Sequence, residues 1–172
     1  MRLTVEHGFD RVTIDAIAQA ANISRRTFSN YFACKEDAVL HGEQLHHQGL
    51  LRALRERPAE ESAWTALRSS VRSLYSWETQ PDREWALRTR LAREHPSLMA
   101  QQLANHAALA RDLEEAVAGR PNPGGVRAGL LVDVFLSALR VGLNTWIDEA
   151  ETRDLLEVVE EVMDEVETPF GG

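Results

Sequence analysis

The stretch from Thr13 to Lys35 reads TIDAIAQAANISRRTFSNYFACK, and the remainder of this 172-residue chain is organised around it. Apolar residues recur at helical spacing over residues 14–21, so this segment is predicted to be a short helix with one inward face. Thr13 is the expected N-cap, because its hydroxyl can accept a hydrogen bond from a free N–H of the first turn. The stretch therefore begins with a capped, amphipathic helix.

A turn and a second short helix follow. Asn22 lies where a tight turn needs a residue that tolerates a left-handed backbone, and Ser24 is expected to cap the next helix. That helix is predicted over residues 25–32, with Phe28 and Phe32 four residues apart on the face toward the first helix. The pattern predicts a helix-turn-helix.

The outer face of the second helix is polar. Its side chains are the donors and small hydroxyls that fit the major groove of DNA, although a solvated face on an ordinary helical hairpin has a similar composition. This face carries Arg25, Arg26, Thr27, Ser29 and Asn30, with Tyr31 beside them.

The spacing of a larger set of residues separates these two interpretations. The set consists of Gly8, Phe9, Thr13, Ile17, Ala18, Ala21, Ser24, Thr27, Phe28, Tyr31, Phe32, Lys35 and Glu36. It resembles the DNA-binding domain of the TetR/AcrR family of bacterial transcriptional regulators over residues 1–45, with a shortened first helix at residues 1–7. The true start of the protein is expected either at Met1 or upstream of it.

The resemblance implies an all-α homodimeric repressor with two domains. Residues 1–45 would form the helix-turn-helix DNA-binding domain, and residues 46–172 a larger helical domain for ligand binding and dimerisation. Tyr31 and Lys35 would hold phosphates, while arginine, threonine and asparagine side chains would read base edges. The implied DNA contacts are Thr13, Ser24, Arg25, Arg26, Thr27, Asn30, Tyr31 and Lys35.

Composition and charge agree with this arrangement. Residues 1–35 carry a net charge of +2 and residues 36–172 carry −10, which suits a protein that touches phosphate with one end only. No run of 18 apolar residues and no signal pattern is present, so a cytoplasmic protein without a membrane partner is expected. The single cysteine, Cys34, excludes an internal disulfide; it is either a redox sensor or, as we expect, a bystander.

Apolar stripes in the second domain predict a site for a mostly apolar inducer. His106 lies within one stripe and would fix a carbonyl or carboxylate of the ligand, although the same residues could fill an ordinary core. The run from Leu87 to Pro96 resembles regulators with an acyl-CoA-like ligand-binding domain, which implies that Arg88, Arg90 or Arg93 meets ligand phosphates. The alternative is that these three arginines are simply solvated. The expected ligand-binding residues are Trp64, Leu67, Val71, Leu74, Trp85, Leu91, Leu103, His106, Phe135 and Leu139.

Two C-terminal helices are the expected homodimer interface. The segment 126–148 is apolar around most of its circumference, and the segment 151–167 has one apolar face, with Thr152 as its expected N-cap. Paired across a two-fold axis, they would form a four-helix bundle, and a dimer would bind a pseudo-palindromic operator. The alternative is that both helices pack within one subunit.

Enzyme function is not expected. The chain has no glycine-rich phosphate loop and no Gly-x-Ser-x-Gly turn, and the Glu-x-x-His spacing of di-metal bundles occurs only at Glu43–His46. His41, His46 and His47 lack a cysteine or carboxylate at a clean metal-ligand spacing, so neither a metal site nor a cofactor is predicted. A helical adaptor or a small helical-bundle enzyme without DNA binding is the alternative function.

Overall fold

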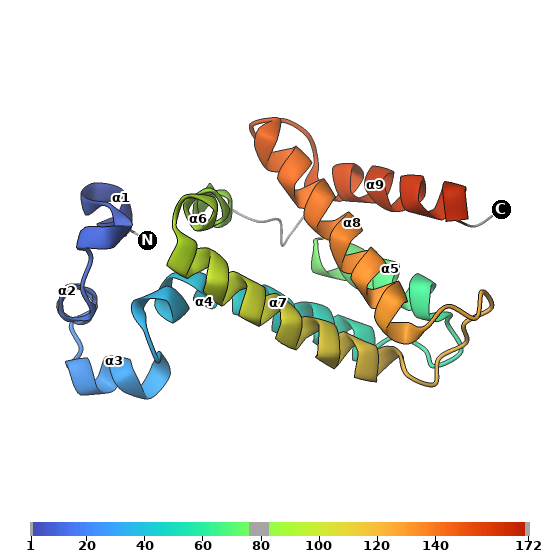
Figure 1. The fold of residues 1–172 in the computed structure, drawn as a ribbon, viewed down its shortest axis with the longest axis horizontal. Helices are drawn as coiled ribbons and strands as arrows, with labels where there is room; N and C mark the ends of the chain where they lie inside the picture. Colours follow the sequence, from blue (N-terminus) through green and yellow to red (C-terminus); the bar gives the residue numbers. More distant parts are fainter. Residues whose placement is uncertain (1, 76–82, 171–172) are drawn as a thin grey trace. The chain divides into compact units, whose positions relative to one another are not determined.

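The computed structural model describes residues 2–75 and 83–170, and it confirms the all-α fold (Figure 1). Within these two ranges the secondary structure is helical and contains no strand. The elements are α1 Arg2–His7, η1 Phe9–Arg11, α2 Ile14–Ala20, α3 Arg25–Tyr31, α4 Lys35–Arg55, α5 Ala63–Leu74, α6 Arg83–Glu94, α7 Pro96–Val117, α8 Ala128–Asp148 and α9 Leu155–Phe170.

The chain divides into two compact units, and each is built from two separate segments. Unit 1 comprises Met1–Leu45 and Asp82–Asn105, and unit 2 comprises His46–Pro81 and His106–Gly172. The sequence-based division assigned 1–45 and 46–172 to two domains, so residues 82–105 group with the first segment rather than with their neighbours in sequence.

Unit 1 begins with the two helices that the sequence predicted. Thr13 Oγ1 accepts from the Ala16 N–H at 3.2 Å, and Ser24 Oγ accepts from the Thr27 N–H at 3.0 Å, so both predicted N-caps are confirmed. Asn22 adopts φ 55°, the left-handed conformation that the turn requires. Local hydrogen bonding thus fixes where each helix starts.

The core of unit 1 is small and apolar. Phe9, Val39, Leu40, Ala92 and Leu98 are buried together, and the half-buried Leu91 packs against them. The cluster draws on η1, α4, α6 and α7, which explains why residues 82–105 belong to this unit.

In unit 2, α8 and α9 lie side by side (Figure 1). A Cβ added at Gly142 would lie 2.9 Å from Val159 Cα, so glycine is needed where α8 meets the α9 backbone. By length and composition α8 is apolar enough to cross a membrane, a test that the core helix of a soluble protein also passes. Burial of Phe135, Leu139 and Trp146 accounts for its apolar composition.

The end of α4 is held by an arginine from the loop after α7. Arg120 donates to the carbonyls of Pro58, Leu54 and Arg57 at 2.6, 3.0 and 3.2 Å. A cation at the carbonyl end of a helix is favourable, because the last carbonyls lack intrahelical partners.

Side-chain caps set helix starts in unit 2, and one predicted cap is wrong. α5 begins at Ala63, because the Ser62 hydroxyl accepts a hydrogen bond from the Thr65 N–H. Thr152 does not cap α9: its hydroxyl donates to the Glu149 carbonyl, and Asp154 accepts from the Glu157 N–H at 3.1 Å. α9 extends through Phe170. The sequence at Thr79–Asp82, which is typical of a helix start, lies outside the described residues.

Candidate nucleic-acid interface and ligand region

The second helix of the helix-turn-helix, α3, presents an exposed polar face. Arg25, Arg26 and Asn30 are exposed, and Tyr31 exposes 78% of its surface. Phe28 on the opposite face is fully buried and lies 5.2 Å, ring to ring, from Phe32. One face of α3 therefore anchors the helix, and the other remains available to a partner.

Arg25 is held in place by the preceding helix. Its guanidinium lies 3.0 Å from the Asp15 carboxylate of α2, and both side chains are largely exposed. An exposed pair of this kind adds little stability. Its consequence is geometric, because it restricts the direction of a side chain that can form two hydrogen bonds with guanine.

The hydroxyl groups at the start of both helices are engaged within the protein. Ser24 Oγ lies 2.8 Å from Thr27 Oγ1, and Thr13 caps α2. Each hydroxyl still has further donor or acceptor capacity. Thr13 and Ser24 are exposed and Thr27 is half-buried, so all three predicted contacts lie in the helix-turn-helix.

Lys35 differs from the other predicted contacts. Its ammonium group donates to the carbonyls of Phe9 at 3.1 Å and Val12 at 3.4 Å, and it lies 4.2 Å from the centroid of the Phe9 ring.

Cys34, which precedes Lys35, is half-buried, and burial raises the pKa of its thiol. A raised pKa keeps the sulfur in the less reactive thiol form, which favours the bystander role.

The predicted ligand residues are divided between the two units. In unit 2, Leu67, Val71, Phe135 and Leu139 are buried, whereas Trp64 and Leu74 are half-buried. In unit 1, Leu91 packs against the core around Phe9. The side chain of Trp85 lies outside the described residues.

Leu103, one of the predicted ligand residues, lies on an exposed face of α7. Leu103 exposes 64% of its surface and Met99 exposes 43%, whereas Leu98, Leu109 and Leu113 are buried. Two neighbouring apolar stripes on one helix look alike in sequence, and packing decides which faces inward. The exposed Leu103 side chain therefore does not line a buried ligand site, and this prediction is wrong.

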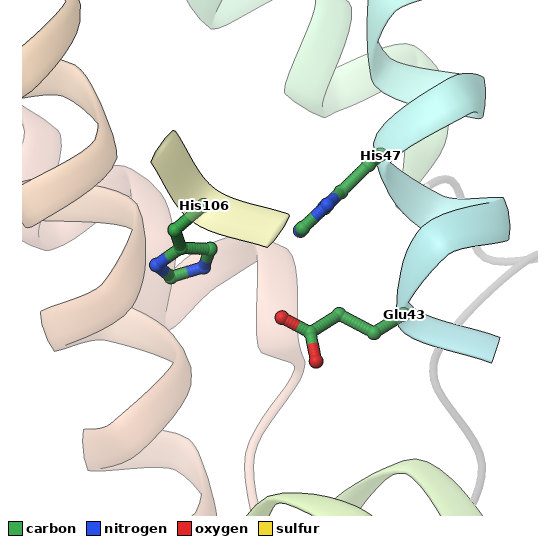
Figure 2. A group of neighbouring side chains, drawn as sticks. All are labelled: Glu43, His47 and His106. Atoms are coloured by element: carbon green, nitrogen blue, oxygen red, sulfur yellow. The ribbon is translucent and has the colours of Figure 1, made fainter. Parts of the chain in front are cut away.

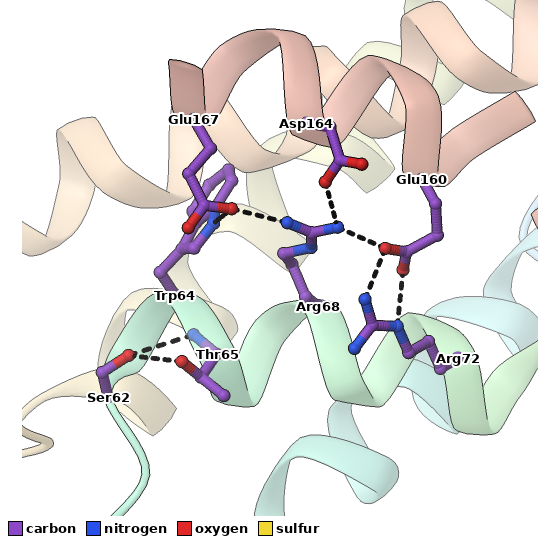
Figure 3. A network of polar contacts seen from close by, with 8 residues as sticks. All are labelled: Ser62, Trp64, Thr65, Arg68, Arg72, Glu160, Asp164 and Glu167. Atoms are coloured by element: carbon purple, nitrogen blue, oxygen red, sulfur yellow. Dashed lines mark hydrogen bonds and ion pairs between the residues drawn. The ribbon is translucent and has the colours of Figure 1, made fainter. Parts of the chain in front are cut away.

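Trp64 belongs to a polar network between α5 and α9 (Figure 3). Its indole N–H donates to Glu167 at 3.4 Å, and its ring meets Phe135 edge-on at 6.4 Å between centroids. Arg68, whose side chain is only 12% exposed, pairs with Glu167 at 2.5 Å, with Asp164 at 2.6 Å and with Glu160. Trp64 and Arg68 therefore help to hold α5 against α9.

The His106 ring lies beside the ring of a second histidine, His47, and the sequence did not predict this pair. Its ring centroid lies 5.6 Å from that of His47 in unit 2 (Figure 2). Burial, followed by the nearby charges of His106 and His46, lowers the pKa of His47 to about 4. Burial and then Arg140 also lower the pKa of His106. Both rings are neutral at pH 7, and a neutral imidazole offers one donor and one acceptor.

Glu43 lies one turn before His47 on α4 (Figure 2). Its carboxylate accepts a hydrogen bond from Gln102 at 3.2 Å. Burial raises the pKa of Glu43 to about 7, although the Gln102 hydrogen bond and the charge of Arg88 both lower it. The sequence had singled out Glu43–His46, but the spacing of four residues places His47 on the same helix face.

A shallow apolar groove runs along α8 and α9 in unit 2. It has a volume of about 310 Å³. The apolar stripe of α9 is thus divided: Leu155, Val158 and Val159 are buried within the unit, whereas Val162 and Val166 line the groove. The other lining residues are Asp133, Val134, Ser137, Ala138 and Val141 of α8.

The fold and the exposed recognition helix define a helix-turn-helix protein. Two family models match: "Bacterial regulatory proteins, tetR family" over residues 1–40, and "MftR C-terminal domain" over residues 61–171, more than half of the chain. The chain belongs to the TetR family of bacterial regulatory proteins.

Two curated relatives support this assignment. The HTH-type transcriptional regulator TcmR of Streptomyces glaucescens is 26% identical over 161 residues, which cover 88% of this chain and 71% of TcmR. The "Putative mycofactocin biosynthesis transcriptional regulator MftR" of Mycobacterium tuberculosis strain H37Rv is 28% identical over 121 residues, which cover 70% of this chain and 61% of MftR. The family and both relatives are transcriptional regulators rather than enzymes, and this chain is a DNA-binding regulator.

Proposed function

We propose that the chain is a cytoplasmic, ligand-responsive repressor that reads a pseudo-palindromic operator with α3. Arg25, Arg26, Thr27 and Asn30 would read base edges, and Tyr31 would hold a phosphate. Thr13 and Ser24 would contact the backbone from the starts of α2 and α3. The single observation that carries this proposal is the exposed polar face of α3 opposite the buried Phe28.

A gel-shift assay on the DNA upstream of the chain's own gene tests this function. We expect a complex that survives excess scrambled duplex, because base contacts add discrimination to non-specific phosphate binding. A matched variant, Asn30→Ala, should lose that discrimination at one operator position. Complexes that scrambled duplex competes away equally well would contradict operator recognition.

The proposed dimer interface is the groove on α8 and α9. Members of the family bind operator DNA and dimerise. Valines from both helices line the groove, and Val141 among them exposes 43% of its surface. Apolar surface of this kind supports a second copy of the chain as its occupant, since a two-fold interface uses the same patch on both subunits.

The proposed inducer is a mostly apolar molecule that carries a polar group. In unit 2 the buried Leu67, Val71 and Phe135 provide apolar surface, and the neutral His106 provides a donor and an acceptor. An acyl-CoA-like molecule has this chemistry, since it combines an apolar acyl chain with polar groups. Ligand binding would favour a dimer geometry in which the two helix-turn-helix segments no longer match the two half-sites of the operator.

Thermal shift and tryptophan quenching against fatty acids, acyl-CoAs and apolar drugs test the inducer. A true inducer raises the melting temperature and releases operator DNA at the same concentration. Ligands that raise the melting temperature without releasing DNA would contradict the regulatory part of the proposal. His106→Phe should lower the affinity for ligands with a polar group and leave the affinity for purely apolar ligands unchanged.

A further inference from the structure

Lys35 occupies a position that its own helix disfavours. It is the only lysine of the chain and the first residue of α4. The N-terminal end of a helix carries partial positive charge, so a cation there is unfavourable, whereas Glu36 and Asp37 in the same turn are favourable. A lysine at this position therefore needs a partner outside α4.

The structure supplies that partner within the protein. The Lys35 ammonium group donates to the Phe9 carbonyl at 3.1 Å and to the Val12 carbonyl at 3.4 Å. It also lies 4.2 Å from the centroid of the Phe9 ring, within the range of a cation–π interaction.

An ammonium group has three N–H donors. Two carbonyls accept from it and an aromatic face lies against it, so at most one N–H remains for a phosphate without breaking these contacts.

These contacts join the two ends of the DNA-reading segment. Phe9 opens η1, and Val12 immediately precedes Thr13, the cap of α2. Lys35 follows the turn after α3. Residues 13–34, which hold both helices of the helix-turn-helix, are therefore enclosed between Val12 and Lys35. Both anchors are fixed, because Phe9 is 2% exposed and Val12 is 4% exposed.

We propose that Lys35 is a positioning residue that clamps the entry of α2 to the start of α4, rather than a contact to DNA phosphate. The proposal rests on the DNA-binding function proposed above. The clamp fixes the relative positions of α2 and α3 before DNA binds. Less of the binding free energy is then lost in ordering the helix-turn-helix.

The first test needs no DNA. Protein labelled with ¹³C and ¹⁵N in lysine gives one set of lysine side-chain signals, because Lys35 is the only lysine. We expect its ε-methylene protons to be displaced by the Phe9 ring and to return toward random-coil positions in Phe9→Leu. Random-coil positions in the unaltered protein would overturn the clamp, whether or not the protein binds an operator.

The second test measures operator affinity against salt concentration for the unaltered protein, Lys35→Met and Lys35→Arg. Lys35→Met keeps the apolar stem and removes the charge, so we expect about tenfold weaker affinity at every salt concentration, with an unchanged slope. Lys35→Arg should recover part of the affinity by donating to the same carbonyls.

A phosphate contact predicts a different result. Each lost contact would reduce the slope of log affinity against log salt by about 0.9, and a dimer would lose two contacts. A slope reduction of this size in Lys35→Met would overturn the proposal. So would a lysine signal that moves when operator duplex is added. If no variant, including the unaltered protein, binds the duplex, the DNA-binding proposal fails while the DNA-free signal still decides the clamp.

Discussion

Arg25 and Arg26 are adjacent on α3, but their surroundings differ. Arg25 is tied to Asp15 at 3.0 Å, whereas Arg26 lies exposed on the next position of the helix. Removing an arginine that contacts guanine lowers the affinity mainly for sequences with that guanine. Removing an arginine that contacts only phosphate lowers the affinity for all sequences alike. The two roles can be separated experimentally.

The first prediction concerns Arg26→Ala. Operator affinity should fall by about 1–3 kcal/mol, while affinity for scrambled duplex changes much less. Arg11→Ala, an exposed arginine of η1, is the matched control and should leave the preference for operator unchanged. Fluorescence anisotropy with both duplexes measures the ratio. Equal losses on both duplexes would assign Arg26 to the phosphate backbone.

The second prediction concerns the pH dependence that His47 introduces. Its pKa is about 4 in the folded protein, below the usual value of 6.5, so the unfolded chain binds more protons between these values. The free energy of unfolding gained from a neutral His47 is present above pH 6.5 and is lost as the pH falls toward 4. Glu43, with a pKa raised to about 7, opposes this trend between pH 4.5 and 7.

Urea unfolding at a series of pH values tests this assignment. His47→Gln should reduce the slope of the free energy of unfolding between pH 4 and 6.5 by up to about 1.4 kcal/mol per pH unit, the value for one proton. Glu43→Gln should increase that slope. An unchanged slope in His47→Gln would show that His47 titrates normally.

At the scale of the elements, two residues of the α8–α9 connection serve the ends of two different helices. Asp154 accepts from the Glu157 N–H, while the Thr152 hydroxyl closes the end of α8. The third prediction is that Asp154→Ala destabilises the protein by about 1 kcal/mol and that Thr152→Val costs less. Thermal unfolding measures both, with about 2–4 °C expected for Asp154→Ala. A larger effect of Thr152→Val would reverse the assignment.

Most of the predicted helix caps were correct, with Thr152 as the exception, whereas contacts between distant segments were not predictable from sequence. Thr13 and Ser24 cap their helices as predicted, because a cap depends on residues within one turn. The Lys35–Phe9 contact and the His47–His106 pair join residues far apart in the chain, and spacing carries no information about them. Leu103 shows a third limit, since periodicity did not distinguish two adjacent apolar stripes.

At the scale of the whole molecule, the groove on α8 and α9 is the surface through which we propose that two copies of the chain bind. The fourth prediction is that Val141→Glu shifts the protein toward monomer, because a buried carboxylate would lie against its own copy across the two-fold axis. Leu103→Glu, the same change at an exposed leucine of α7, is the control. Light scattering at micromolar concentration reports the mass. A dimer that survives Val141→Glu would exclude this groove as the interface.

The central claim is that α3 reads a defined operator, and selection from a random pool of duplexes tests it most directly. The purified protein is incubated with the pool at physiological salt, and bound duplexes are recovered, amplified and sequenced. We predict an enriched pseudo-palindrome whose half-site centres lie about one helical turn of DNA or a multiple of it apart, with positions that relax in Arg26→Ala. Recovered duplexes with no common sequence, or a consensus unchanged by substitutions on α3, would contradict the account.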